Sequence, residues 1–359
     1  MFPSQLRGRR SRRAHAIISA AFVSLSLVSL SLVALSLVAG CGQGSKITAI
    51  GKIVATRSAS TFPDKIYAYP YRALYAAVAT LKADRHTAKA VELKALGAIP
   101  SGIWAAGQSG VMQQIKNITQ AAEGAHAVPV IVAYNLPDRD VCGKYSAASG
   151  PTSQGYTIWI NQLAAAVGSG HDIIVVEPDG LADILLGCLS PALVAVRYQL
   201  LRYAMQRLGS LPNAHVYLDA GNPGMFSDPA LLADPLVRAG IRYGRGFSAN
   251  VSNFQWTSTV VAWSQRLEAT LGGSVGVLID TSRNGNGPYT GSDAPQWCNP
   301  PGRAPGPVPQ LDPGPAGIDG YLWIKNPGVS DGTCNGGPPA GQFWTQYAVG
   351  LAQSQARRA

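Results

Sequence analysis

The chain has 359 residues, of which 47% are hydrophobic and only 13% are charged, so a disordered or highly charged chain is excluded. Its length allows two average domains or one large α/β barrel. The net charge of +10 falls to +5 when the five arginines among the first thirteen residues are set aside. No basic stripe with interleaved aromatic residues remains, which argues against a nucleic-acid partner.

Residues 1–41 have the pattern of an export signal, because an arginine cluster precedes a long apolar run. The run ends in Leu-Val-Ala-Gly-Cys41, which resembles a bacterial lipobox. We therefore expect lipidation of Cys41 at the outer face of the membrane. An uncleaved membrane anchor is the alternative, since about 20 apolar residues span a bilayer. In both cases the folded part is exported; residues 42–62 form a tether, and 63–359 form one domain.

Helix-like and strand-like segments alternate from residue 67 onward, and the strands are uniformly apolar, as in sheets covered on both faces. This pattern predicts a parallel barrel or a doubly wound sheet. No nucleotide-binding glycine motif follows a strand, so nothing favours the sheet. The predicted helices are 73–83, 87–96, 111–123, 156–167, 191–208, 258–271 and 342–353. One predicted strand ends at 103–104, and the others are 128–134, 173–176, 216–218, 246–249, 275–279 and 321–324.

Five of these strands end in, or lead into, an aspartate: Asp140, Asp179, Asp219, Asp280 and Asp331. A single aspartate after a strand is usually a turn former or a helix cap. Five in series favour another interpretation, because the carboxyl ends of barrel strands converge on the face where such enzymes place their chemistry. The five histidines form no Ser/His/Asp or His-x-x-x-His pattern, so neither a catalytic triad nor a metal site is expected.

Apart from Cys41, the chain has four cysteines, and an even number in an exported chain predicts two disulfides. Four cysteines allow three pairings, and the spacing does not choose among them. A Cys-x-x-Cys pair is absent from the sequence, which argues against a zinc site.

Six short motifs then follow one another along the chain. They are 132–140 (VAYNLPDRD), 176–182 (VEPDGLA), 217–221 (YLDAG), 246–253 (GFSANVSN), 297–303 (WCNPPGR) and 323–332 (WIKNPGVSDG). In this order they resemble glycoside hydrolase family 6, the inverting β-1,4-glucanases, over residues 65–353. The resemblance implies a distorted, TIM-like (β/α) barrel with fewer than eight strands. It also implies the disulfides Cys142–Cys188 and Cys298–Cys334.

The resemblance assigns roles to the acids. Asp179 would be the general acid and Asp331 the expected base, while Asp140 would raise the pKa of Asp179 as a neighbouring anion. Tyr134 would crowd the sugar at the cleavage point and favour a distorted ring. An inverting pair of carboxyls stands about 6.5–9.5 Å apart, which leaves room for the attacking water.

Other motif residues are expected to hold the sugar chain or the water. These are Asp219, Ser146, Trp104, Trp297, Lys325, Arg303 and Asn222. The resemblance therefore implies a monomeric endo-β-1,4-glucanase without metal or cofactor, acting on cellulose or a related β-glucan. The short loop between Cys298 and Cys334 favours an open cleft and internal cleavage. The protein would contact a membrane only through its N-terminal lipid or anchor, or be secreted.

Three departures from the family pattern leave two alternatives open. Val141 is inserted in the usual Arg-Asp-Cys, Asn222 and Met225 stand where the family commonly has histidine and tryptophan, and Val329 stands where a glutamate is common. The alternatives are a non-catalytic glucan-binding relic of the same fold and a hydrolase of a different β-linked glycan.

Overall fold

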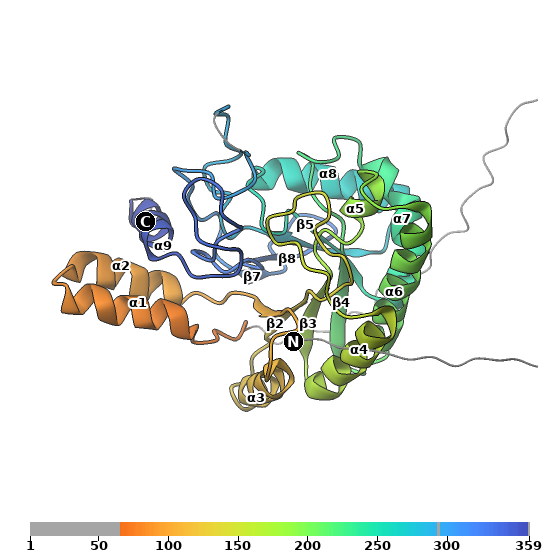
Figure 1. Cartoon of the computed structure of the whole chain (residues 1–359), viewed down its shortest axis with the longest axis horizontal. Helices are drawn as coiled ribbons and strands as arrows, with labels where there is room; N and C mark the ends of the chain where they lie inside the picture. The colour runs from red at the N-terminus through yellow and green to blue at the C-terminus, as the bar shows by residue number, and fades with distance from the viewer. Residues whose placement is uncertain (1–64, 293–294, 358–359) are drawn as a thin grey trace, which may run out of the picture. The chain divides into compact units, whose positions relative to one another are not determined.

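The computed structural model describes residues 65–292 and 295–357, which contain one sheet with the strand order β1-β2-β3-β4-β5-β6-β8-β7 (Figure 1). The strands are β1 (Ile103–Ala105), β2 (Val130–Ala133), β3 (Asp172–Val176), β4 (Ala214–Asp219), β5 (Gly246–Ala249), β6 (Gly276–Asp280), β7 (Gln310–Leu311) and β8 (Ile318–Leu322). All neighbours are parallel except β7, which pairs antiparallel with β8 at the edge.

Most of the helices connect the parallel strands and cover the outer face of the sheet, while the first two precede β1 and the last follows β8. The helices are α1 (Arg72–Ala83), α2 (Thr87–Gly97), α3 (Val111–Gly124), α4 (Ser153–Val167), α5 (Ala182–Leu185), α6 (Pro191–Gly209), α7 (Ala233–Arg238), α8 (Thr257–Thr270) and α9 (Thr345–Ala356). The predicted distorted barrel is confirmed, with seven parallel strands and the short antiparallel β7. The predicted disulfides Cys142–Cys188 and Cys298–Cys334 are confirmed too.

Side chains of each strand alternate between the two faces of the sheet, because successive residues of a strand point in opposite directions. Ile131, Ile174 and Val216 lie opposite one another in register and join the outer core beneath the helices. The next residues along, such as Val132 and Val175, point into the barrel and form a separate interior cluster. The strands are apolar throughout because both faces are buried.

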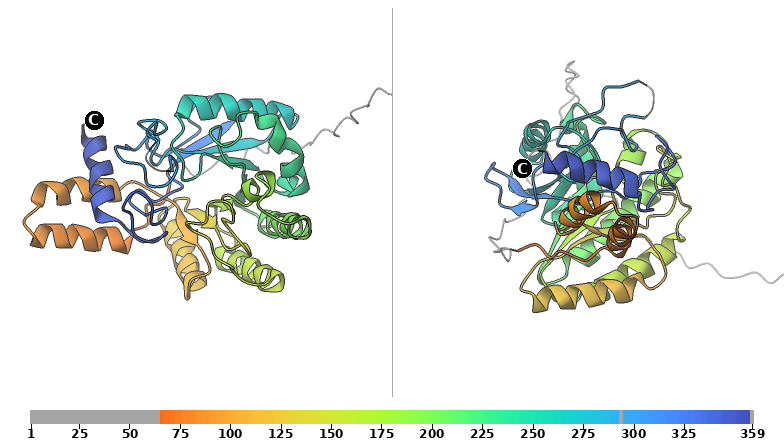
Figure 2. Two further views of the ribbon diagram at one scale, coloured as in Figure 1. Left: turned by 45° about the horizontal axis from the view of Figure 1, so that its top comes forward. Right: turned by 90° about the vertical axis from the view of Figure 1, so that its left-hand side faces the viewer.

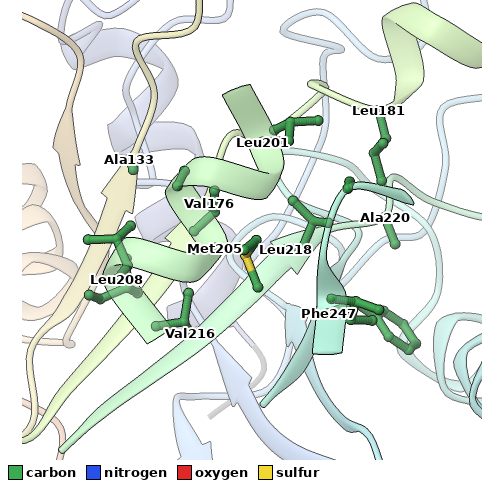
Figure 3. Packing of buried hydrophobic residues seen from close by; sticks show 14 of the residues in the cluster. Ala133, Val176, Leu181, Leu201, Met205, Leu208, Val216, Leu218, Ala220 and Phe247 are labelled. Atoms are coloured by element: carbon green, nitrogen blue, oxygen red, sulfur yellow. The ribbon is translucent and has the colours of Figure 1, made fainter. Parts of the chain in front are cut away.

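Helix α6 shows how the outer layer is held (Figure 3). Its residues Leu201, Met205 and Leu208 lie on one side of the helix and pack towards Val216 and Leu218 of β4. All three helix residues are fully buried. Burial of each such side chain is worth about 1.5–3 kcal/mol, so the outer core supports the strands whose ends carry the site.

A second core joins the two ends of the described chain. Helix α9 lies against the hairpin of α1 and α2 in all three ribbon views (Figures 1 and 2). Leu93 and Leu96 of α2, Leu351 of α9 and Trp323 after β8 are buried together there. The C-terminal helix is therefore packed on the N-terminal hairpin and on the segment that follows β8.

The edge strand β1 approaches the residues that follow β8, near the other edge of the sheet. The Gly102 N–H donates to the Trp323 carbonyl at 2.8 Å, and Trp104 Nε1 donates to the Ile324 carbonyl at 2.9 Å. A Cβ on Gly102 would stand 2.2 Å from the Ile324 oxygen. Only glycine allows this approach, which brings Trp104 beside Lys325.

Three predicted elements begin three residues away from their predicted starts. Helix α4 starts at Ser153 rather than 156, because the Thr152 side chain caps it by accepting the Gly155 N–H. Strand β8 starts at Ile318 rather than 321, because Arg245 and Tyr217 bind Asp319 and so let an acid lie inside a strand. Helix α9 starts at Thr345 rather than 342, because the preceding residues bond to 328–330. The sequence did not indicate α5, α7, β7 or the 3-10 helices Pro229–Leu232 and Ile241–Tyr243.

The signal segment 1–41, the tether 42–62 and Cys41 lie outside the described residues. Among the helices of the described part, none has the length and apolar character needed to cross a membrane.

We predict that Gly102→Ala lowers the free energy of unfolding by about 1–3 kcal/mol, the usual cost of overpacking. The matched control is Gly124→Ala at the end of α3, where a Cβ meets nothing within 4 Å. Alanine there should stabilise the protein by up to about 1 kcal/mol. Urea unfolding followed by circular dichroism measures both; equal effects of the two variants would contradict the close approach at Gly102.

Candidate active site

A cleft of about 1300 Å³ opens at the carboxyl ends of the parallel strands. Among the residues that line it are most of those expected from the sequence: Trp104, Tyr134, Asp140, Ser146, Asp179, Asn222, Trp297, Lys325 and Asp331. The alternation of the strands explains their convergence. Tyr134 continues the inward series of Val130 and Val132, just as Trp104 packs against the interior cluster from β1.

Two expected residues lie elsewhere. Asp219 is buried behind the cleft at the end of β4, where its carboxylate accepts the backbone N–H of Asp179 at 3.1 Å. Arg303 does not line the cleft: its guanidinium donates to the carbonyls of Gly287 and Pro301 and lies over the Tyr289 ring. Asp219 is therefore placed to act through Asp179, and Arg303 holds a neighbouring loop.

Asp179 is partly exposed on the floor of the cleft, with a left-handed backbone (φ 66°). Burial raises the pKa of its carboxyl well above the ordinary value, and the anions Asp219, Asp140 and Asp183 raise it further in that order. Asp140 is thus the third cause of the raised pKa, after burial and Asp219. Lys325 opposes the shift without cancelling it. The surroundings of Asp179 therefore favour the protonated form of its carboxyl.

Asp219 is itself kept in place by hydrogen-bond donors. Besides the Asp179 N–H, its carboxylate accepts the Ser248 hydroxyl at 3.1 Å and the Gly221 N–H at 3.2 Å. Burial raises the pKa of Asp219 to about 6, against the effect of these donors. The backbone that carries Asp179 is thus bonded to a second carboxyl on the next strand.

Asp331 has the opposite environment. Arg283 Nη1 lies 2.8 Å from one carboxylate oxygen and Lys325 Nζ 2.9 Å from the other. The Asn299 N–H adds a third donor at 3.0 Å. Burial alone would raise the pKa of Asp331, but the two cations outweigh it, and the pKa lies below its usual value. The two cations therefore favour the ionised form of Asp331, in the same cleft in which burial and neighbouring acids favour the protonated form of Asp179.

A hydrogen-bonded chain runs along one wall of the cleft. Both the N–H and the hydroxyl of Ser146 lie 2.7 Å from Asp140 Oδ2, and the Ser146 hydroxyl is 3.0 Å from the Tyr134 hydroxyl. Burial, with Asp179 second, raises the pKa of Tyr134, so the phenol is neutral. These hydrogen bonds connect the Asp140 carboxylate to the Tyr134 hydroxyl through Ser146.

Sequence reasoning missed the two arginines of the site. Arg283 is fully buried against Asp331 and also lies over the Phe254 ring. Arg139 lies over the Tyr134 ring and donates to the Tyr134 carbonyl at 2.8 Å. Arg139 was visible only as part of the first motif. Arg283 lies three residues after the strand-end Asp280. A buried carboxylate such as Asp331 needs a cation nearby, and an arginine close to a strand end was a candidate for it.

Aromatic rings occupy two places on the rim. Trp104 meets Tyr134 edge to face at a centroid distance of 5.2 Å. Trp297 meets Tyr145 in the same way at 5.5 Å, so the loops of the two disulfides touch above the site. Tyr145 and Trp297 remain 38% and 40% exposed. Flat, accessible rings of this kind can stack on sugars.

The three departures fall in and beside the cleft. Met225 and Val329 line it, and Val329 is almost fully buried. The inserted Val141 donates its N–H to Asp183. Among the residues that the structure describes, no three His, Cys, Asp or Glu side chains form a group that could hold a metal ion.

A protonated carboxyl and an ionised one in a single cleft can serve as an acid and a base in the same reaction. Comparisons with known proteins identify the family of the chain. The model of the glycosyl hydrolases family 6 matches residues 62–355. "Endoglucanase 1" of Streptomyces sp. (strain KSM-9) is 39% identical over 262 residues, covering 72% of this chain and 70% of the relative. "Endoglucanase A" of Cellulomonas fimi is 37% identical, covering 79% of this chain and 59% of the relative.

A solved structure agrees with the sequence relatives. The endoglucanase Cel6 from Mycobacterium tuberculosis, determined with a thio-linked cellobioside, has a TM-score of 0.74 and 37% identity to this chain. The match covers 82% of this chain and 98% of that one. Endoglucanase CEL6B from Humicola insolens, 21% identical with a TM-score of 0.68, shares the fold.

We predict that Lys325→Met raises the pKa of the Asp331 carboxyl, because one of its two cations is removed. The measurement is the carboxyl ¹³C shift of Asp331 over a pH titration, assigned with Asp331→Asn. Lys89→Met on the exposed face of α2 is the control and should leave that pKa unchanged. An Asp331 pKa that stays low in Lys325→Met would show that Arg283 alone sets it.

Proposed function

Because the chain belongs to glycosyl hydrolase family 6, we propose that this glycoside hydrolase is a cellulase that cleaves internal β-1,4 bonds of cellulose or a related β-glucan with inversion. One observation carries the proposal: two carboxyls with opposite surroundings line the same cleft, Asp179 among other acids and Asp331 between two cations. Residues 63–359 are the catalytic domain in this proposal. The names of the relatives support the cellulase assignment.

In the proposed reaction Asp179 donates its proton to the glycosidic oxygen as the bond to the anomeric carbon breaks. Its raised pKa supports this role, since a general acid must stay protonated near the working pH. Burial favours this protonated form most, and the nearby Asp219 and Asp140 add to the effect. Tyr134 is held by an edge-to-face contact with Trp104. It crowds the sugar ring and favours the distorted, oxocarbenium-like geometry.

A water attacks the anomeric carbon from the opposite face and loses its proton to Asp331. The two cations on Asp331 keep it ionised but also make it a weak proton acceptor. Ser146 orients this water in our proposal, and its bond to Asp140 supports that position. Asp140 thus acts in two ways in this proposal. It holds Ser146, which orients the water, and its charge raises the pKa of Asp179.

The sugar chain is proposed to stack on Trp104 and Trp297 and to bond to Lys325 and Asn222 along the cleft. Arg303 supports the cleft from the adjoining loop rather than by direct contact. Tyr145 and Trp297 touch above the site, yet both rings keep more than a third of their surface exposed. The accessible surface of both rings supports their contact with a bound sugar chain.

We also propose that the protein is exported and acts outside the cell as a monomer. Two disulfides support export, because such bonds persist in oxidising compartments. The sequence pattern of residues 1–41 supports attachment of the domain to the outer face of the membrane through lipidated Cys41, with 42–62 as the tether. Radiolabelled palmitate incorporation that is lost in Cys41→Ala would test the anchor.

We predict that Asp179→Asn lowers kcat on a soluble β-1,4-glucan by about 10²- to 10⁴-fold, the usual contribution of a general acid. Viscosity and reducing ends are followed together, because internal cleavage lowers viscosity before many ends appear. Asp312→Asn, at an exposed aspartate outside the cleft lining, is the matched control.

Three outcomes of this assay would overturn parts of the proposal. Full activity of Asp179→Asn would remove its role as the acid. A folded wild type that hydrolyses only mixed-linkage or substituted β-glucan would change the substrate, as Val329 and Met225 in the cleft allow. Binding of glucan without hydrolysis of any of them would identify a non-catalytic relic.

We predict that the first product carries the α-anomer at its new reducing end, because an inverting enzyme turns a β bond into an α product. Proton NMR of cello-oligosaccharide digests distinguishes the anomers before mutarotation mixes them. A β-anomer that appears first would establish retention and would exclude Asp331 as a base acting on water.

A further inference from the structure

The two loops that carry Asp140 and Asp179 have strained backbones. In the loop 135–142 after β2, Asp138 and Asp140 have φ values of 50° and 53°. In the loop 177–183 after β3, Glu177 and Asp179 have φ values of 49° and 66°. Such left-handed residues persist only where their surroundings hold them. The contacts that do so are made by three buried ionisable side chains, one of which, Asp183, also raises the pKa of Asp179.

Glu177 binds the start of the loop 135–142. Its carboxylate accepts the N–H groups of Asn135 at 3.0 Å and Leu136 at 3.1 Å, and the Tyr156 hydroxyl at 3.0 Å. Glu177 is 1% exposed and lies two residues before Asp179. Every partner is a donor, so the carboxylate cannot be replaced by an amide without bringing two donors together.

Asp183 binds the other end of the same loop. It accepts the Cys142 N–H at 3.1 Å and the N–H of the inserted Val141 at 3.3 Å. Its exposure is 2%, and it lies four residues after Asp179. The two carboxylates that flank Asp179 in sequence therefore hold the loop of Asp140 on both sides.

Arg197 of α6 binds the middle of the loop 135–142 and also contacts the loop 177–183. Its guanidinium donates to the carbonyls of Pro137 at 3.0 Å and Asp138 at 2.7 Å in the one loop, and to Gly180 at 3.2 Å in the other. It also pairs with Asp183 at 3.4 Å, and both side chains are 3% exposed. One buried cation thus joins both loops to the outer helix layer.

We propose that Glu177, Asp183 and Arg197 are positioning residues that lock the loop 135–142 onto the loop 177–183 and so fix Asp140 and its Ser146 relative to Asp179. The proposal rests on the function proposed above. Asp183 has the further task of accommodating Val141, because it binds the N–H groups of the inserted residue and of the cysteine after it. The insertion is then compatible with an intact site.

The lock depends on matching each buried ionisable group with hydrogen-bond partners of the opposite kind. The carboxylates meet donors and the guanidinium meets acceptors, and charge-assisted hydrogen bonds of this kind are stronger than neutral ones. The Cys142–Cys188 disulfide holds the loop only at its outer end. Without the three charged side chains, the left-handed residues between β2 and Cys142 would be free to relax.

The test compares Asp183→Asn and Arg197→Met with Arg245→Met. The control breaks another Arg–Asp ion pair, Arg245–Asp319 at 2.8 Å, in which the aspartate is buried and the arginine is 16% exposed. This pair lies at the amino ends of the strands, away from the cleft. We expect kcat to fall 10- to 100-fold in the first two variants with KM changed less than threefold. Arg245→Met should lower only the melting temperature.

The pH dependence of kcat/KM distinguishes positioning from loss of stability. Asp183→Asn removes an anion that raises the pKa of Asp179, so the basic limb should move to lower pH. Arg197→Met leaves the Asp183 charge uncompensated, so the limb should move to higher pH. Opposite shifts support the proposal, and a profile that neither variant changes would overturn it.

Hydrogen exchange tests the lock without any substrate. The amides of 135–142 should exchange slowly in the wild type and at least tenfold faster in Asp183→Asn and Arg197→Met, but not in Arg245→Met. Unchanged exchange in both variants would overturn the lock even in an active enzyme. A wild type that hydrolyses no glucan but shows this exchange pattern would overturn the proposed function and leave the lock intact.

Discussion

The mouth of the barrel buries several carboxylates within one small volume, and the rest of the site depends on how each charge is compensated. Ionised groups in such a place cost free energy unless they are paired or hydrogen-bonded. Asp331 has two cations. Asp219 has backbone and hydroxyl donors, which offset burial only in part. Asp179 faces other anions, and protonation is the remaining way to lower its energy. The acid and the base of the proposed reaction are therefore set by the distribution of donors.

The same constraint explains why Lys325 lies where it does. It follows β8, at the seam where Gly102 lets β1 approach the residues that follow β8. There it binds Asp331 at 2.9 Å and lies 5.6 Å from the Trp104 ring. A wider seam would separate the cation from its carboxylate and from the aromatic wall. The close approach at Gly102 thus also determines how near Lys325 lies to Asp331, and so affects the charge of that carboxyl.

Much of this could be predicted from the sequence, for a physical reason. Strands buried on both faces leave continuous apolar runs, and acids at their ends stand out against them, so the order of the elements and the convergence of Asp140, Asp179 and Asp331 were accessible. β8 was misplaced because Asp319 interrupts its run and is neutralised by residues distant in sequence. The ion pair of Arg283 was missed because pairing across 48 residues leaves no local signal.

The positions of Asp219 and Arg303 show where motif reasoning reaches its limit. A motif identifies residues that matter near a site but does not distinguish one that faces the substrate from one that holds its neighbour. Asp219 shares the inward face of β4 with Tyr217, yet the backbone of Asp179 lies over it. Arg303 turns to the carbonyls of its own loops because their oxygens need donors. Hydrogen-bond requirements of the backbone, which no sequence pattern displays, decide which side chains remain available to the cleft.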